Sequence, residues 1–365
     1  MLTRRALASA LGAASLVAMV AAQDGPAFQP TVDNFTIDNF EFSTGEKLPQ
    51  LRIHYRTLGE KKQDGNGKTT NAVLIMHGTS GSGGNFLNAR FGNELFAKGQ
   101  PLDMETHFII MPDGIGHGQS SKPSDGLKAR FPKYGYRDMV KAHHALVTEH
   151  LGVNHLRLVM GTSMGGMHSW LMGGMYPDLM DALFPLASVP TQISGRNRMM
   201  RRVILTSIQE DPNYKDGEYE SPPIQGLKAA RAVSMWMSSV PLQMQKDAPT
   251  TSAADEQLAK TMSRFESKPP DANDLLYQYN SSTDYDPEPL LPSIKAQLVA
   301  VNSADDQINP PELGILEENV KKIPDGKGKA VMIPISDETS GHGTHSIPKL
   351  WKEDLVQLLG ATEGG

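Results

Sequence analysis

Ser163 has a glycine two positions away on each side, in the segment Gly161–Gly165. This Gly-x-Ser-x-Gly pattern is typical of a serine on a sharp turn between a strand and a helix, where glycines avoid steric clashes and a histidine reaches the hydroxyl. The preceding run, Leu156–Met160, predicts a buried strand, and Gly165–Met175 predicts a helix. A serine hydroxyl is a weak nucleophile at neutral pH and needs such a setting. Ser163 is therefore predicted to be a nucleophile.

Two loops further along the chain supply candidates for the groups that would activate this serine. Asp305 and Asp306 follow the predicted strand Gln297–Val301, and His342 and His345 lie in the loop before the final helix. In such a site a histidine takes the serine proton and a carboxylate orients the histidine. Serine, acid and histidine in this chain order, each after a predicted strand, form a rarer coincidence than any one of them alone. We expect His342, with His345 as the alternative, to be the base, and one of the two aspartates to be the acid.

Backbone donors for an oxyanion are expected from the turn His77–Gly81, which follows a predicted strand ending at Met76. Its glycines let N–H groups face a carbonyl oxygen. We expect the N–H groups of Thr79 and Met164 to form the oxyanion hole. A second glycine-rich turn contains His117, which we expect to be structural because the glycines suffice to explain the turn.

No cofactor and no metal ion is expected. The glycine-rich segment after Gly81 lacks the Gly-Lys-Ser/Thr ending of a phosphate-binding loop, and no spacing matches a dinucleotide fingerprint. His143 and His144 are adjacent on a predicted helix, so their side chains point in different directions. The chain has no cysteine, which excludes disulfides and thiolate metal sites. A formal net charge of −6 argues against nucleic acid as a partner. A small-molecule ester or acyl compound is the partner that the serine predicts.

The elements that must position these residues alternate between strands and helices. Strand-like runs occur at Leu51–Leu58, Ala72–Met76, His107–Met111, Leu156–Met160, Ala182–Leu186, Gln297–Val301 and Ala330–Ile335. Helical patterns lie between many of them, notably at 136–151 and 350–359. This alternation predicts an α/β fold with a mainly parallel central sheet flanked by helices. Residues 189–292 contain no convincing strand and predict a mostly helical cap, which divides the core into residues 23–188 and 293–365.

Residues 1–22 predict an export signal. Arg4 and Arg5 precede the apolar run Ala6–Ala22, which ends in small residues. The mature chain is expected to begin near Gln23, and no later run is long enough to predict a membrane span. We therefore expect a secreted or periplasmic protein with no membrane association after signal removal. The twin-arginine and general export routes both stay open, as does the oligomeric state, with a homodimer as one alternative.

Several further motifs resemble those of one enzyme family. The stretches concerned are Tyr136–Val140, Gly161–Met167, Gly195–Asn197, Asp211–Tyr214, Gly226–Leu227, Ala230–Arg231 and the loops at Asp306 and Gly341–His342. Together they resemble the homoserine O-acetyltransferase-like branch of the α/β-hydrolase superfamily, from about Leu51 to the C-terminus. The resemblance implies a triad of Ser163, Asp306 and His342. It favours Asp306 over Asp305, because the family acid stands four residues before a proline and Pro310 stands here at that distance.

The chain departs from that family in two places. Family acetyltransferases carry an aspartate directly after the catalytic histidine that helps hold the amino-acid substrate, whereas Gly343 stands here. They also carry a long glycine- and cysteine-containing segment after the third strand, whereas this chain passes quickly from Asp113 to Gly135. An exported protein would meet neither acetyl-CoA nor homoserine, which are cytosolic metabolites. The expected function is an exported serine hydrolase that cleaves an ester, less readily an amide, through an acyl-enzyme.

Two other functions stay open at this point: an O-acyltransferase of the homoserine acetyltransferase type, and a catalytically silent binding protein on the same fold. Arg196 and Arg231 are candidate substrate-binding residues, because a guanidinium group can hold a carboxylate through two hydrogen bonds. Pairing of these arginines with acidic residues on the surface of the cap is the alternative.

Overall fold

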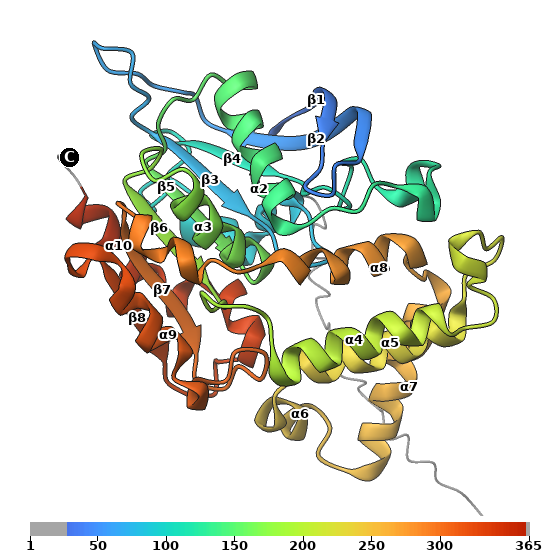
Figure 1. The fold of residues 1–365 in the computed structure, drawn as a ribbon. Coiled ribbons are helices and arrows are strands. Elements are labelled where there is room, and N and C mark those ends of the chain that lie inside the picture. Colours follow the sequence, from blue (N-terminus) through green and yellow to red (C-terminus); the bar gives the residue numbers. More distant parts are fainter. Residues whose placement is uncertain (1–27, 363–365) are drawn as a thin grey trace, which may run out of the picture.

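The computed structural model describes residues 28–362, in which eight strands form a single sheet (Figure 1). The strands are β1 (Thr31–Glu41), β2 (Lys47–Leu58), β3 (Ala72–Met76), β4 (Phe108–Pro112), β5 (Leu158–Thr162), β6 (Ala182–Leu186), β7 (Gln297–Ser303) and β8 (Gly328–Ile333). Their order across the sheet is β1-β2-β4-β3-β5-β6-β7-β8. β2 pairs antiparallel with β1 and β4, and every pairing from β4 to β8 is parallel. The predicted mainly parallel α/β sheet is confirmed.

The sequence analysis missed β1 at one edge of the sheet. Its residues, Thr31–Glu41, are mostly exposed and include two Asp-Asn pairs, which are unfavourable in strands. Ten pairings with the longer β2 hold this strand in place. Tertiary pairing therefore overrides a weak local preference at this edge.

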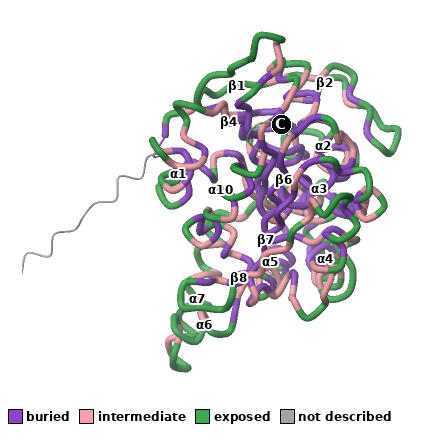
Figure 2. Tube along the Cα trace, turned by 90° about the vertical axis from the view of Figure 1, so that its left-hand side faces the viewer, coloured by how far each residue is buried: buried purple, intermediate pink, exposed green. Residues whose placement is uncertain are grey.

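Helices cover both faces of the sheet. The core helices are α1 (Ala89–Leu95), α2 (Tyr136–Ala145), α3 (Met164–Met175), α9 (Ile315–Asn319) and α10 (Lys352–Ala361). Side chains alternate across β3, so that Leu74 and Met76 pack with α2 and α3, whereas Val73 and Ile75 pack with α1 and α10. Burial of both faces explains why the parallel strands are continuous apolar runs. The buried part of the chain runs along this sheet in Figure 2.

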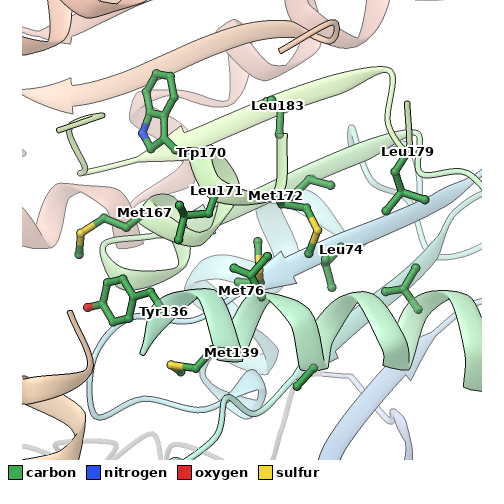
Figure 3. Packing of buried hydrophobic residues seen from close by; sticks show 14 of the residues in the cluster. Leu74, Met76, Tyr136, Met139, Met167, Trp170, Leu171, Met172, Leu179 and Leu183 are labelled. Atoms are coloured by element: carbon green, nitrogen blue, oxygen red, sulfur yellow. The ribbon is translucent and has the colours of Figure 1, made fainter. Parts of the chain in front are cut away.

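The packing between β3, α2 and α3 fixes the helix that follows Ser163. Figure 3 shows Leu171 and Met172 of α3 close to Met76, with Met139 of α2 on the other side. All four side chains are fully buried. Burying one such side chain contributes about 1.5–3 kcal/mol relative to leaving it exposed. The position of α3 is therefore strongly determined by apolar contacts.

Five helices lie between β6 and β7 in the chain, within the segment predicted as a cap. They are α4 (Gly195–Gln209), α5 (Ile224–Ser238), α6 (Pro241–Asp247), α7 (Thr251–Ser267) and α8 (Ala272–Asn280), and residues 189–292 contain no strand. Figure 1 shows α4 and α5 side by side, apart from the sheet. A small apolar cluster joins α4, α5 and α8 through residues such as Ile204, Leu227 and Leu276. This group of helices thus has its own core.

Polar contacts attach these helices to the sheet. The half-buried Asp284 carboxylate accepts hydrogen bonds from the backbone N–H groups of Tyr136 (2.7 Å) and Arg137 (3.0 Å) at the start of α2. The Gln278 side chain accepts from Ser80 Oγ (2.7 Å) and donates to the Gly116 carbonyl (2.8 Å). The cap segment is therefore tied to both glycine-rich turns. Within residues 28–362, no helix has the length and apolar character needed to cross a membrane.

Candidate active site

Ser163 lies on a strained turn between β5 and α3. Its backbone adopts φ 54° and ψ −111°, and its N–H donates to the Leu186 carbonyl at 2.9 Å. Such a conformation costs about 1–3 kcal/mol in a residue other than glycine. A Cβ on Gly161 would lie 2.3 Å from the Gly165 backbone, and one on Gly165 would lie 1.9 Å from the Met76 carbonyl oxygen. Both glycines of the motif are thus required by close backbone contacts.

Three predicted side chains form one hydrogen-bonded chain. Ser163 Oγ is 2.8 Å from His342 Nε2, and His342 Nδ1 is 2.8 Å from Asp306 Oδ2. His342 and Asp306 are 7% and 1% exposed, respectively. Since an ionised carboxylate can only accept, Nδ1 carries the proton in the neutral ring and Nε2 accepts from the serine hydroxyl. The sequence therefore identified the residues that meet here.

The carboxylate of Asp306 is held by several donors. Burial alone raises the pKa of this group, but the His342 ring, the Ile308 N–H and the Asn309 side chain together hold the pKa below its ordinary value. The Ile308 N–H donates to Oδ1 at 2.8 Å, and Asn309 Nδ2 donates to Oδ2 at 3.1 Å. Asp306 is therefore charged at neutral pH and orients His342.

The alternative acid and base lie elsewhere. Asp305 accepts hydrogen bonds from the Ser303 and Thr339 hydroxyls. These bonds connect the loop that contains Asp306 to the loop that contains His342. His345 packs edge-to-face on His342, with ring centroids 5.4 Å apart, and its Nδ1 contacts Ser346 Oγ at 2.9 Å. Burial lowers the pKa of His345 to about 3. Neither residue takes part in the hydrogen bonds that link Ser163, His342 and Asp306.

The His77–Gly81 turn approaches the serine closely. A Cβ on Gly78 would lie 3.4 Å from Ser163 Cβ. His77 Nδ1 donates to the Gly78 carbonyl at 2.8 Å, because Nε2 accepts from the Gly114 N–H at 2.9 Å and so cannot carry the proton. A trans peptide places its N–H opposite its C=O, so the Thr79 N–H points away from the His77 ring. Within the described chain, no protein acceptor bonds to that N–H.

Met164 supplies the second expected donor as the first residue of α3. The first N–H groups of a helix have no partner within the helix and lie at its positive end. Its side chain is buried, so only the backbone faces the turn at Ser163. Among residues 28–362, no acceptor bonds to the N–H group of Thr79 or Met164, as an oxyanion hole requires.

The other histidines discussed in the sequence analysis, His117, His143 and His144, lie in or near the core. His117 Nδ1 contacts the Ile115 carbonyl at 2.9 Å, and burial lowers the pKa of this histidine to about 3. His143 is buried near His168, whereas His144 stacks on Tyr176, with ring centroids 3.8 Å apart. No group of three potential metal ligands is found within residues 28–362.

Ser163 and His342 lie where two cavities meet. The larger, of about 960 Å³, lies between the cap helices and the His77–Gly81 turn, and we call it the cap lobe. The smaller, of about 380 Å³, lies between residues 187–197 and residues 307–317, which follow Asp306, and we call it the loop lobe. Arg201 and Ile308 also line both lobes. Both volumes lie in the range of small-molecule sites.

The two predicted substrate-binding arginines lie in different lobes. Arg231 is half-buried in the cap lobe. Arg196 is exposed at the loop lobe, where its guanidinium group donates to the Gln307 carbonyl. Arg198 lines neither lobe. The structure therefore does not bring Arg196 and Arg231 together around one ligand group.

Arg201 was missed by the sequence analysis. It is 4% exposed, and its hydrogen bonds go to Asn197 Oδ1 (3.0 Å) and Ser282 Oγ (3.4 Å) rather than to a carboxylate. The sequence does contain a pattern that indicates a special role for Arg201. Positions 201, 204, 205 and 208 form the buried face of α4, and the first of them is charged. An arginine on an apolar helix face indicates a special environment.

Comparisons with known proteins agree with this fold. The family model described as alpha/beta hydrolase fold matches residues 71–337. The chain is 30% identical over 305 residues to a homoserine O-acetyltransferase of Haemophilus influenzae, covering 73% of this chain and 81% of that protein. It is 28% identical over 329 residues to a probable acyltransferase of Methanothermobacter thermautotrophicus, covering 89% and 97%. The solved structure of the acetyl esterase MekB superposes with a TM-score of 0.78 at 21% identity, covering 90% and 97%.

The fold, the site and these relatives define an enzyme of the serine hydrolase and acyltransferase class. The chain belongs to the alpha/beta hydrolase fold family, and within it to the homoserine O-acetyltransferase-like branch. Labelling of Ser163 by a fluorophosphonate tests the remaining alternative, a catalytically silent binding protein on this fold.

Proposed function

We propose that this protein is an exported serine hydrolase that cleaves a small-molecule ester through an acyl-enzyme. The observation that carries the proposal is the chain Ser163–His342–Asp306, with both links at 2.8 Å, at the meeting point of two cavities. A hydroxyl bonded to a buried neutral imidazole is poised to lose its proton as it attacks a carbonyl.

In the proposed cycle, Ser163 Oγ attacks the ester carbonyl while its proton passes to His342 Nε2. The resulting oxyanion accepts hydrogen bonds from the Thr79 and Met164 N–H groups. The His342 imidazolium, stabilised by Asp306, then gives its proton to the departing alcohol. Water attacks the acyl-enzyme with His342 again as base, which releases the acid and restores the serine.

The charges of the cap lobe support a substrate whose alcohol part is anionic. Arg201, Arg231 and Arg264 line this lobe, and within residues 28–362 no carboxylate lies within ion-pair distance of any of them. The two lining carboxylates are already engaged, since Asp271 accepts from Tyr219 and Asp274 accepts from Ser124. Three cations without a carboxylate partner in the described part of the chain favour a carboxylate or phosphate on the substrate.

Acyl transfer to an alcohol is the second candidate function. It is favoured by the two curated relatives, which are described as an acyltransferase and a homoserine O-acetyltransferase. Gly343 argues for hydrolysis instead, because the family aspartate that would help hold homoserine is replaced by a residue without a side chain. Both reactions share the acyl-enzyme, so the acceptor that reaches it decides between them.

Hydrolysis of p-nitrophenyl esters by wild type and Ser163→Ala tests the proposal. We expect wild type to release p-nitrophenol and the variant to lose at least about a thousandfold in kcat. Equal activity in both proteins would show that another group is the nucleophile. Product analysis with and without added homoserine separates the two functions, since an acyltransferase forms acyl-homoserine at the expense of the free acid.

Export is the part of the proposal that rests on residues 1–22, which lie outside the described residues. The charged start, the apolar run and the small-residue end support it. Fractionation of cells that express the full chain tests it. We expect a product shortened by about 22 residues outside the cytoplasm, and a full-length cytoplasmic product would contradict export.

A further inference from the structure

The two lobes that meet at Ser163 have different chemistry. An ester carbonyl carries two substituents, the acyl chain and the alkoxy group, which leave the reacting carbon in different directions. A serine at the junction of two cavities therefore offers one cavity to each substituent. Which lobe takes which part of the substrate follows from the side chains that line them.

Most of the wall of the loop lobe is apolar. Its apolar side chains include Met167, Ala187, Val189, Ile193 and Leu316. Met167, Ala187 and Leu316 are buried, and Val189 and Ile193 are half-buried. Such walls favour a hydrocarbon chain, since each methylene removed from water is stabilised by contact with them.

Three polar side chains of the loop lobe, those of Tyr285, Asn302 and Asn309, are already bonded within the protein. Tyr285 donates its hydroxyl proton to the Val189 carbonyl at 2.8 Å. Asn302 accepts from the Ser188 N–H at 3.0 Å, and Asn309 donates to the Ala187 carbonyl at 2.9 Å. An apolar ligand would therefore leave the Tyr285 hydroxyl, Asn302 Oδ1 and Asn309 Nδ2 with the partners that they already have.

The cap lobe is less suited than the loop lobe to a hydrocarbon chain. Arg201 lines both lobes, and Arg196 at the loop lobe donates to the Gln307 carbonyl. Arg231 and Arg264 line the cap lobe without carboxylate partners, and covering them with methylenes would remove their charges from water. The same groups suit a polar or anionic alcohol part, as proposed above. The contrast between the lobes assigns each a different half of the ester.

We propose that the loop lobe is the acyl-binding subsite, which accepts linear apolar chains longer than acetyl, such as butyryl and hexanoyl. The inference rests on the proposed hydrolase function. Val189 and Ile193, at the entry to the cap segment, are specificity-determining residues for chain length. The alcohol part of the ester occupies the cap lobe.

The test compares kcat/KM for p-nitrophenyl acetate, butyrate and hexanoate, which share one leaving group. Each buried methylene is worth about a fourfold gain, so wild type should favour hexanoate over acetate by more than about tenfold. Val189→Phe fills the lobe and should lower this ratio at least tenfold. Ile193→Ala widens the lobe and should extend the preference to octanoate, which keeps the test informative if Val189→Phe does not fold.

Leu275→Phe is the matched control, because Leu275 is a half-buried apolar residue that lines the cap lobe alone. This variant should lower kcat/KM for the three esters by a common factor and leave their ratios unchanged. A chain-length ratio that responds to Leu275→Phe and not to Val189→Phe would assign the acyl chain to the cap lobe and overturn the proposal. A wild-type enzyme that prefers acetate, with ratios insensitive to both loop-lobe variants, would overturn it as well.

These outcomes differ from a failure of the proposed function. If wild type hydrolysed none of the esters and a fluorophosphonate did not modify Ser163, the hydrolase proposal would fail, and the acyl subsite with it. If the esters were hydrolysed and Ser163 was modified, the hydrolase proposal would stand. The kcat/KM ratios between esters would then test the assignment of the loop lobe alone.

Discussion

At the scale of residues, Asp306 acts on the reaction only through His342. Its carboxylate lies 2.8 Å from His342 Nδ1 and does not contact Ser163. In the proposed cycle, its role is to select the ring tautomer in which Nε2 accepts the serine proton, and to stabilise the imidazolium that forms. Asp306 is therefore a positioning residue with a large electrostatic effect.

We expect Asp306→Asn to lower kcat by about 10⁴ with little change in KM. An amide in this place can donate to Nδ1, which moves the ring proton to Nε2 and leaves no acceptor for the serine hydroxyl. Asp305→Asn is the matched control, because Asp305 bonds only to Ser303 and Thr339. Steady-state kinetics on one ester checks the prediction, and similar losses in the two variants would contradict it.

His77 is the residue that orients the turn of the expected oxyanion donor. Its Nδ1–H holds the Gly78 carbonyl at 2.8 Å, and with it the peptide that contains the Thr79 N–H. We expect His77→Phe to lower kcat by about 10- to 100-fold, less than complete loss of a donor. His77→Asn, which keeps a donor near the Gly78 carbonyl, should recover part of this loss. Equal kcat values for wild type and His77→Phe would show that the turn holds its shape without this bond.

At the scale of elements, α2 is attached to the cap segment through its N-terminus. Asp284 accepts from two N–H groups of the first turn of α2, and Asp138 accepts from Ser43 and from the Gly135 N–H. The Tyr136–Val140 motif, noted as part of the family resemblance, therefore has a structural explanation. Its backbone and its aspartate join the cap, the N-terminal strands and α2.

We expect Asp284→Ala to lower the free energy of unfolding by about 1–2 kcal/mol, since two N–H groups at a helix start lose their acceptor. Asp286→Ala is the control, because the Asp286 side chain bonds only to the exposed Gln192 amide. It should change the free energy of unfolding by less than about 0.5 kcal/mol. Urea denaturation followed by circular dichroism measures both values. Equal changes in the free energy of unfolding for the two variants would show that the hydrogen bonds of Asp284 do not stabilise the fold.

Strands of the core could be predicted from the sequence because they are buried on both faces. Ala72–Met76 and Ala182–Leu186 have the bounds that their apolar runs predict, whereas β5 ends two residues later than expected, directly before Ser163. The edge strand β1 could not be predicted, because pairing with β2 rather than its own composition holds it. The residues that meet at Ser163 followed from motif order, and Arg201 could have been found from its place on the apolar face of α4. The lobes depend on how the helices pack, which no local pattern contains.

At the scale of the whole molecule, several buried histidines make stability depend on pH. His77, His117, His143 and His168 are all buried, and burial lowers the pKa of each below its ordinary value. Below pH 6.5 the unfolded chain binds protons that the folded chain excludes, so the free energy of unfolding falls as the pH falls. For His117 and His143, whose pKa burial lowers to about 3, the loss is about 1–2 kcal/mol each between pH 7 and pH 5.

We expect His168→Phe to remove one such contribution. Neither ring nitrogen of His168 has a hydrogen-bond partner, so an apolar ring of similar size leaves no buried donor without an acceptor. The variant should be more stable than wild type at pH 5 by about 1–2 kcal/mol, and the difference should shrink at pH 7.5. Urea denaturation at the two pH values tests this. A difference independent of pH would show that the gain comes from packing and not from protonation.

The account as a whole depends on Ser163 being a nucleophile activated by His342. Mass spectrometry of peptides after reaction with a fluorophosphonate tests this most directly, because the reagent bonds covalently to an activated serine. We predict one adduct per chain, located on Ser163, and a large loss of labelling in His342→Ala. An unmodified Ser163 in the wild-type protein, or an adduct that forms equally well in His342→Ala, would contradict the account.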